Sequence, residues 1–164
     1  MKTLFTIVMA TLLTACNALQ PDAMSSSDLP IAGDLIFTAS VDETIEASKA
    51  VLKDKKWKIL YDGEDKPTKN YSFFSNAAPF NNIDYDRVTW DMTLNSTIAP
   101  KHYIQAKTPT NLISFGAELF ITIFESPKNG SIVSIAASSS QLAEKKKLGA
   151  YLEEFSNLMN EKID

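Results

Sequence analysis

Histidine and serine are the residues of this chain that could together form a hydrolytic centre. His102 is the only histidine and stands at the start of a predicted strand. General acid-base chemistry needs a positioned partner, and the sequence supplies none for this imidazole. The triplet Ser138 to Ser140 lacks the G-x-S-x-G pattern of a nucleophile, so we expect it to end a strand or cap a helix. We expect no enzyme, with a hydrolase using His102 and a serine as the alternative.

A second group of residues is similar to the opening of a calcium loop. Asn82, Asp84 and Asp86 place oxygen atoms at alternate positions. Arg87 stands where the loop needs glycine, however, and Thr93 stands where it needs a bidentate glutamate. With one histidine and one cysteine in the chain, a zinc site is not expected either. We therefore predict no metal and no cofactor.

An aromatic segment in the middle of the chain is a candidate for contact with a protein partner. It contains Phe73, Phe74, Phe80 and Tyr85, with few charged neighbours. Aromatic side chains at loop edges often anchor protein interfaces. The alternative is that the three phenylalanines complete the core beneath a loop. The same segment could also line a groove for a peptide or glycan.

Lys145, Lys146 and Lys147 form the other candidate surface for a partner. They lie early in a predicted C-terminal helix, where the helix dipole disfavours positive charge. Either the helix begins later, or these lysines face an anionic lipid or an acidic protein. The simpler interpretation is a solvated face, because three adjacent residues point around most of a helical turn.

The N-terminus combines a positive charge, a short apolar run and small residues before the only cysteine. Lys2 precedes an almost wholly apolar stretch over 4–13, and two further residues separate that stretch from Cys16. A membrane-spanning helix needs about 20 apolar residues, so this stretch is too short to cross a bilayer. Its parts and their order are typical of a cleaved signal peptide, here residues 1–15. The alternative is an ordinary thiol near a conventional cleavage site.

The segment Leu13-Thr14-Ala15-Cys16 resembles the lipobox of bacterial lipoproteins. The resemblance implies cleavage before Cys16, diacylglycerol (for example, palmitate chains) on its sulfur and, usually, a further acyl chain on its amino group. More than one acyl chain makes attachment lasting, at about 0.8 kcal/mol per buried CH2. Enterobacterial lipoproteins with aspartate after the cysteine stay in the inner membrane. Asn17 therefore implies the outer membrane, with the protein facing the periplasm.

Composition and charge constrain the part of the chain after the cysteine. The segment 17–30 contains three serines and two prolines, a composition that predicts a flexible spacer, so we expect residues 16–32 to form a lipidated flexible tether. The net charge of -4 becomes -5 on cleavage, because residues 1–15 contain one lysine and no acidic residue. This acidic balance argues against nucleic acid as a partner. A single cysteine excludes an intramolecular disulfide. Residues 33–164 suffice for one domain.

Local patterns place the first elements of that domain. Leu35 to Phe37 form a predicted strand, and Ser40 with Glu43 makes a capping box that starts a helix. After the helix, the alternation over 57–61 predicts a strand with Trp57, Ile59 and Tyr61 on one face.

Further strands are predicted over 71–75, 87–94, 103–107, 113–123 and 132–137, with a bulge at Gly116 and a tight turn at Asn129-Gly130. An apolar stripe over 148–163 predicts a long terminal helix.

This order predicts an α+β fold: an antiparallel sheet of about six strands, one short helix after the first strand, and a long C-terminal helix packed on one face. The segments 103–106, 115–118 and 132–140 resemble small envelope domains of the helix-grip or TATA-binding-protein-like type. That resemblance concerns the fold and implies no activity.

We therefore expect a non-enzymatic lipoprotein of the bacterial cell envelope. It would be membrane-attached through Cys16 and would bind a protein or other envelope component in the periplasm. The first alternative is a periplasmic immunity or inhibitor protein that neutralises a toxin or hydrolase, because a tight interface needs no catalytic residues. The second is an envelope hydrolase that uses His102 and a serine.

Overall fold

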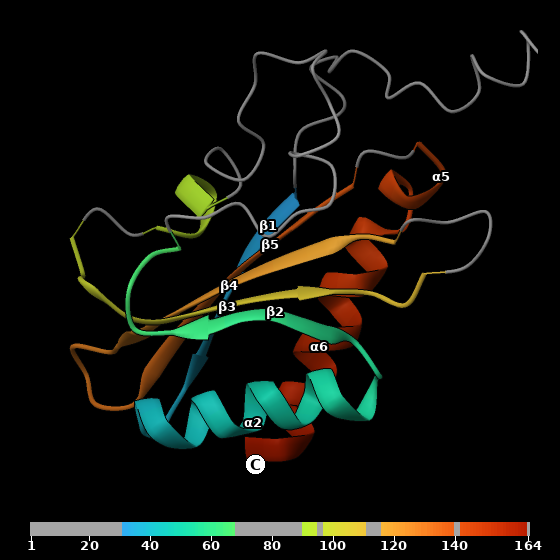
Figure 1. The fold of residues 1–164 in the computed structure, drawn as a ribbon. Helices are drawn as coiled ribbons and strands as arrows, with labels where there is room; N and C mark the ends of the chain where they lie inside the picture. Colours follow the sequence, from blue (N-terminus) through green and yellow to red (C-terminus); the bar gives the residue numbers. More distant parts are fainter. Residues whose placement is uncertain (1–30, 68–89, 95–96, 111–115, 140–141, 164) are drawn as a thin grey trace, which may run out of the picture.

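The computed structural model describes residues 31–67, 90–94, 97–110, 116–139 and 142–163 (Figure 1). Within them the chain forms one antiparallel sheet with helices on one of its faces, which confirms the predicted α+β class. In chain order the elements are β1 (Ile31–Phe37), α2 (Val41–Asp54), β2 (Lys58–Gly63), β3 (Pro100–Lys107), β4 (Glu118–Glu125), β5 (Ser131–Ser138), α5 (Leu142–Lys145) and α6 (Leu148–Ile163).

The described part of the sheet has five strands in the order β1-β5-β4-β3-β2. Every neighbouring pair is antiparallel. Ile104, Ile121 and Ile135 face one another across the three central strands, and β1 and β2 form the two edges. The strand predicted over 71–75 lies outside the described residues.

The start of α2 is fixed by the predicted capping box. The Ser40 backbone N–H donates to Glu43 Oε2 at 2.9 Å, and the Glu43 N–H donates to Ser40 Oγ at 3.3 Å. These two bonds satisfy donors that an uncapped helix leaves open. The hydrogen bond from the Ser40 backbone also lowers the pKa of the Glu43 carboxyl.

The end of α2 is a Schellman motif formed without glycine. Trp57 N–H donates to the Leu52 carbonyl at 2.8 Å, and Lys56 N–H donates to the Lys53 carbonyl at 2.9 Å. Lys56 has a φ of 56°, a conformation that a side chain adopts only at some cost. The motif directs Trp57 into the core, where its ring meets Tyr151 edge-on with centroids 6.0 Å apart.

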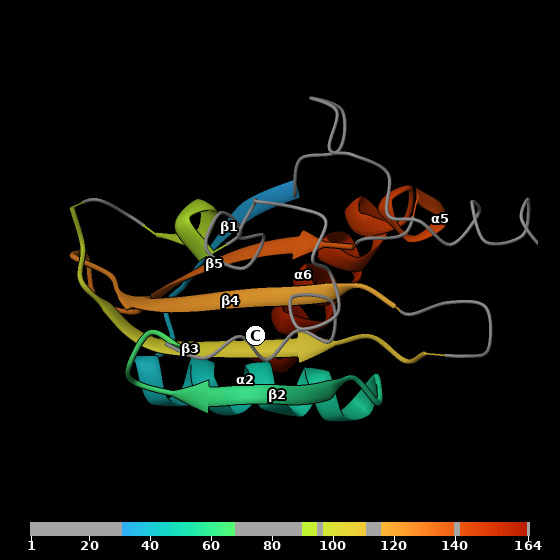
Figure 2. The ribbon, with the colours of Figure 1, turned by 45° about the horizontal axis from the view of Figure 1, so that its top comes forward.

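The main core lies between the sheet and the helices α2 and α6, which cover the same face (Figures 1 and 2). α6 contributes Leu148, Leu152, Phe155 and Met159 at helical spacing, as its apolar stripe predicts. Its acidic and basic residues also reach α2, where Lys162 Nζ lies 2.7 Å from an Asp54 oxygen. Among the described residues, no helix is both long and apolar enough to cross a membrane.

The face of the sheet opposite α2 and α6 has a smaller core of its own. Trp90 packs edge-on against Phe120 of β4 and Tyr103 of β3, with centroids 5.1 and 5.5 Å away. Thr93 Oγ1 lies 2.7 Å from Thr122 Oγ1 on the same face. β4 is therefore buried on both faces along all but its last residue.

The strand predicted over 87–94 is wrong for 90–93, which form a helical turn; residues 87–89 lie outside the described residues. Trp90, Thr93 and Leu94 are the members that face the sheet, three and four residues apart, while the two residues between them are exposed. That spacing is helical. In so short a segment the residues also fit the alternation of a strand, which is why the sequence predicted one.

Two glycine positions need the conformations that only glycine adopts easily. Asn129 and Gly130 have φ values of 68° and 93°, which confirms the predicted hairpin turn between β4 and β5. A Cβ on Gly130 would lie 2.1 Å from the Phe37 carbonyl oxygen. Gly116 has a φ of 78°, and β4 begins only after it, at Glu118. The strand predicted over 113–123 is thus shorter within the described residues.

Candidate functional site

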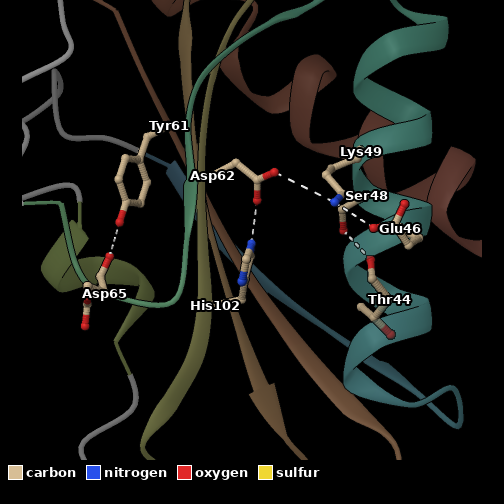
Figure 3. A network of polar contacts seen from close by, with 8 residues as sticks. All are labelled: Thr44, Glu46, Ser48, Lys49, Tyr61, Asp62, Asp65 and His102. Carbon is tan, nitrogen blue, oxygen red and sulfur yellow. Dashed lines mark hydrogen bonds and ion pairs between the residues drawn. The ribbon is translucent and has the colours of Figure 1, made fainter.

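β2 contains an irregularity that changes the direction of its side chains. Its register against β3 shifts between Ile59 and Tyr61. Ile59 packs in the core beneath the helices, whereas Tyr61 packs with Trp90 on the opposite face. Residues two apart in a regular strand share a face, so the predicted placement of Tyr61 with Ile59 is wrong. The same reversal directs Asp62 toward α2 (Figure 3).

Asp62 and His102 meet at this edge of the sheet. His102 Nε2 lies 2.5 Å from Asp62 Oδ1. Asp62 Oδ2 lies 3.7 Å from Lys49 Nζ, and Lys49 Nζ lies 2.6 Å from Glu46 Oε1 (Figure 3). We call these four residues the α2–β3 network. It joins β3, β2 and α2 through successive polar contacts.

The network runs from the protein interior to solvent. The His102 side chain is only 12% exposed, the Asp62 side chain is 35% exposed, and the Glu46 side chain is 74% exposed. The hydrogen bond that Lys49 donates to Glu46 raises the pKa of Lys49, and the negative charge of Asp62 acts in the same direction. Lys49 is therefore held as a cation between two carboxylates.

The hydroxyl groups behind the network are closed to solvent. Thr44 Oγ1 and Ser131 Oγ are 2.6 Å apart, and Ser48 Oγ donates to the Thr44 carbonyl at 2.8 Å. All three side chains are fully buried. Because each hydroxyl already has a partner and none reaches the surface, we do not assign a nucleophile here.

An imidazole beside a carboxylate supplies two of the three members of a catalytic triad, and the third is a hydroxyl hydrogen-bonded to the second ring nitrogen. Within the described residues, the side-chain partner of His102 is the Asp62 carboxylate. Ser138 does not complete a triad: His102 is level with Val133 of β5 through Ile123, and Ser138 is five residues further, about 17 Å along the strand.

The three serines of the predicted triplet have structural positions. Ser138 ends β5, as predicted. Ser139 Oγ donates to the Gly116 carbonyl at 3.0 Å. Ser140 lies outside the described residues.

A second polar cluster lies where α5 meets α6. Tyr151 Oη donates to Glu144 Oε2 at 2.7 Å, and Lys147 Nζ lies 2.9 Å from Glu144 Oε1. Glu144 is buried, so these contacts hold a carboxylate inside the fold. Burial, followed by the hydrogen bond to Glu144, raises the pKa of Tyr151 to about 12.

The raised pKa of Tyr151 predicts a loss of stability at alkaline pH. A phenol with a higher pKa in the folded state stabilises the fold fully below about pH 10, its unfolded pKa, and loses that contribution as the pH rises to about 12. We expect the loss to reach about 2 kcal/mol. Urea unfolding of the native protein and of Tyr151→Phe across this range measures it. The two curves should converge as the pH rises, and parallel curves would contradict the prediction.

The lysine triplet lies at the junction of two helices. Lys145 ends α5, and Lys146 and Lys147 form the turn before α6, which begins at Leu148. The Tyr151 N–H donates to the Lys147 carbonyl, which starts the helix. The long helix therefore begins after the lysines, which is the first of the two predicted explanations.

The remaining predicted site residues lie outside the described residues. They are the lipidation site Cys16, the aromatic candidates Phe73, Phe74, Phe80 and Tyr85, and the predicted loop residues Asn82, Asp84 and Asp86. Within the described ranges, no group of three or more histidine, cysteine, aspartate or glutamate residues is arranged to hold a metal ion.

Sequence reasoning missed the partners of His102. Asp62 precedes a glycine and is typical of a turn residue, while Lys49 and Glu46 are typical of a solvated helix face. Only the strand irregularity brings them together, and no local signal in the sequence marks it.

No family model matches this chain, and no curated protein matches its sequence.

Proposed function

We propose that this protein is a lipid-anchored component of a bacterial cell envelope that acts by binding another envelope protein. The observation that carries the proposal is the segment Leu13-Thr14-Ala15-Cys16, which comes after a positive charge and a short apolar run. Acylation of Cys16 would attach the mature chain to the membrane. Asn17 favours the outer membrane, with the domain facing the periplasm.

The contacts of His102 favour a structural role for this residue over a catalytic one. The imidazole is largely buried and is paired with Asp62, and the hydroxyl groups of the neighbouring core are buried and paired with one another. In this position the α2–β3 network fastens α2 to the edge of the sheet. A structural role accounts for each of its contacts without a substrate.

Cross-linking and affinity capture of the acylated protein from its own envelope test the proposal. We expect one stoichiometric protein partner. Its identity would separate an assembly factor from a toxin or hydrolase that the protein inhibits. Recovery of the intact, membrane-attached protein with no protein partner would contradict the binding role.

Replacement of His102 by alanine separates the structural role from catalysis. His102→Ala removes a partly buried, charge-assisted contact, so we expect the free energy of unfolding to fall by about 1 kcal/mol. Asp62→Asn should have a similar effect, and partner capture should be unchanged in both variants. Thermal unfolding and the capture assay are the two measurements.

Lys101→Ala, next to the histidine and exposed, is the matched control and should change stability by less than about 0.5 kcal/mol. If His102→Ala had the same effect on the cells as loss of the whole protein, while the fold and partner capture stayed intact, the hydrolase interpretation would replace the structural one.

A further inference from the structure

One end of the sheet is defined by a continuous row of paired residues. Lys58 of β2, Lys107 of β3, Glu118 of β4 and Ser138 of β5 are successive partners across four strands. β1 begins beside this row at Ile31. α2 ends and α5 begins at the same end of the molecule, toward the right in Figures 1 and 2. We call this the basic end.

Lysines gather at the basic end from elements that are far apart in the sequence. They come from the last turn and C-terminus of α2, the start of β2, the end of β3 and the α5–α6 junction: Lys53, Lys55, Lys56, Lys58, Lys107, Lys145, Lys146 and Lys147.

Several of these lysines are not used to hold the fold together. Lys53, Lys56, Lys58 and Lys146 are exposed and make no ion pair within the described residues. Lys58 lies directly opposite Lys107, which is level with Glu118 on its other side.

The acidic groups at the basic end offset only part of its positive charge. Glu118 and Glu144 are buried beneath it, Glu144 pairs with Lys147, and Glu153 of α6 is exposed. Two more carboxylates are engaged by lysines: Glu154 pairs with Lys55, and Asp54 pairs with Lys162.

The opposite end of the domain is acidic. Exposed carboxylates lie in the first turn of α2, after β2 and at the end of β4, and two of the lysines there are already paired, Lys101 with Glu125 and Lys66 with Asp91. The exposed acidic residues are Asp42, Glu43, Glu64, Asp65 and Glu125. Within the described residues, positive charge thus gathers at one end of a chain whose net charge is -4.

The chain between the proposed anchor and the fold enters the domain at the basic end. Cys16 and Ile31 can be no more than about 50 Å apart even if the chain between them is fully extended. An acylated Cys16 would therefore keep the basic end within that distance of the bilayer. At such a high effective concentration, a weak surface interaction is enough to dock the domain.

We propose that the basic end docks on the anionic phospholipid surface of the membrane that holds the anchor, so that the acidic end faces the periplasm. This inference rests on the lipid anchor of the proposed function. Lysines close to an anionic bilayer attract it, and salt weakens that attraction.

Energy transfer from the protein to labelled lipid headgroups tests the docking. Acylation blocks Cys16, so the acylated full chain can carry a donor dye on one introduced cysteine, either Ala150→Cys near the basic end or Pro127→Cys on the opposite hairpin. Each protein is reconstituted with vesicles of phosphatidylcholine alone and of phosphatidylcholine with phosphatidylglycerol. We expect anionic lipid to raise transfer from position 150 only, and about 1 M salt to abolish the increase.

Charge variants identify the surface. Removal of Lys53, Lys58 and Lys146 together, each replaced by glutamine, should weaken docking about fivefold per lysine, or about a hundredfold in all. The matched control replaces Lys66, Lys101 and Lys128 at the opposite end, removes the same charge and should leave docking unchanged. Circular dichroism checks that both variants fold.

The possible outcomes separate the anchor from the docking. Protein that floats with neither vesicle contradicts the lipid anchor, and the docking proposal falls with it. If the protein floats with both kinds of vesicle, but energy transfer from position 150 is the same with and without anionic lipid, the docking proposal is overturned and the lipid anchor stands. Equal losses in the two triple variants also overturn it, as does docking that appears only when envelope proteins are added, which would assign the basic end to an acidic protein.

Discussion

The Cys16→Ala variant is expected to leave the membrane fraction almost completely. Acylation needs the Cys16 sulfur, and two or more acyl chains, at about 0.8 kcal/mol per buried CH2, make attachment effectively permanent. Fractionation of cells, with a high-salt wash of the membranes and detection of the protein in both fractions, measures the change.

The neighbouring replacement Ser26→Ala is the control for this experiment, because it changes the same segment and leaves the cysteine in place. It should stay with the membrane. If the Cys16→Ala protein remained in the washed membranes at the same level as the control, the lipid anchor would be wrong. The docking surface at the basic end would not rescue it, since high salt screens that attraction.

The Phe120→Ala variant is expected to lose about 3–5 kcal/mol of unfolding free energy, enough to unfold much of a marginally stable domain. Phe120 is fully buried on the face of the sheet opposite α2 and α6, where its ring meets Trp90 at 5.1 Å. Truncation leaves a cavity between the sheet and the helical turn that begins at Trp90. Urea unfolding monitored by circular dichroism measures the loss.

The control lies on the same face of the same sheet. Ile36 of β1 is 76% exposed, so Ile36→Ala should change stability by less than about 0.5 kcal/mol. A double-mutant cycle between Phe120 and Trp90 should give a coupling of about 0.5–1.5 kcal/mol for the edge-on ring contact. Equal, small effects at positions 120 and 36 would show that this face is open to solvent.

The elements that local signals specify were predictable from the sequence. The capping box at Ser40, the Asn129-Gly130 turn and the apolar stripe of α6 each depend on residues a few positions apart, and all three are confirmed. The antiparallel sheet with helices on one face agrees with the order of these elements.

Features that depend on distant residues were not predictable. Phe120 and Phe124 make the second face of β4 apolar as well, but the residue that covers it, Trp90, comes from elsewhere in the chain and could not be named from the pattern of the strand. The helical turn at 90–93 was not predictable for the same reason. The spacing of its apolar residues fits both a helix and a strand, and the contact between Trp90 and Phe120 accompanies the helical form.

The candidate site shows the same division. His102 could be named from the sequence as the only imidazole, but its partner Asp62 could not, because an irregularity of one residue in β2 turns that carboxylate toward α2. The basic end likewise combines lysines from four regions that are far apart in the sequence and that the fold brings together.

The mass of the N-terminal peptide of the mature protein, purified from membranes, tests the lipid anchor. We expect a chain that begins at Cys16 and carries diacylglycerol on the sulfur, with a further acyl chain on the amino group. A chain that begins at another residue, or an unmodified Cys16 thiol, would contradict it.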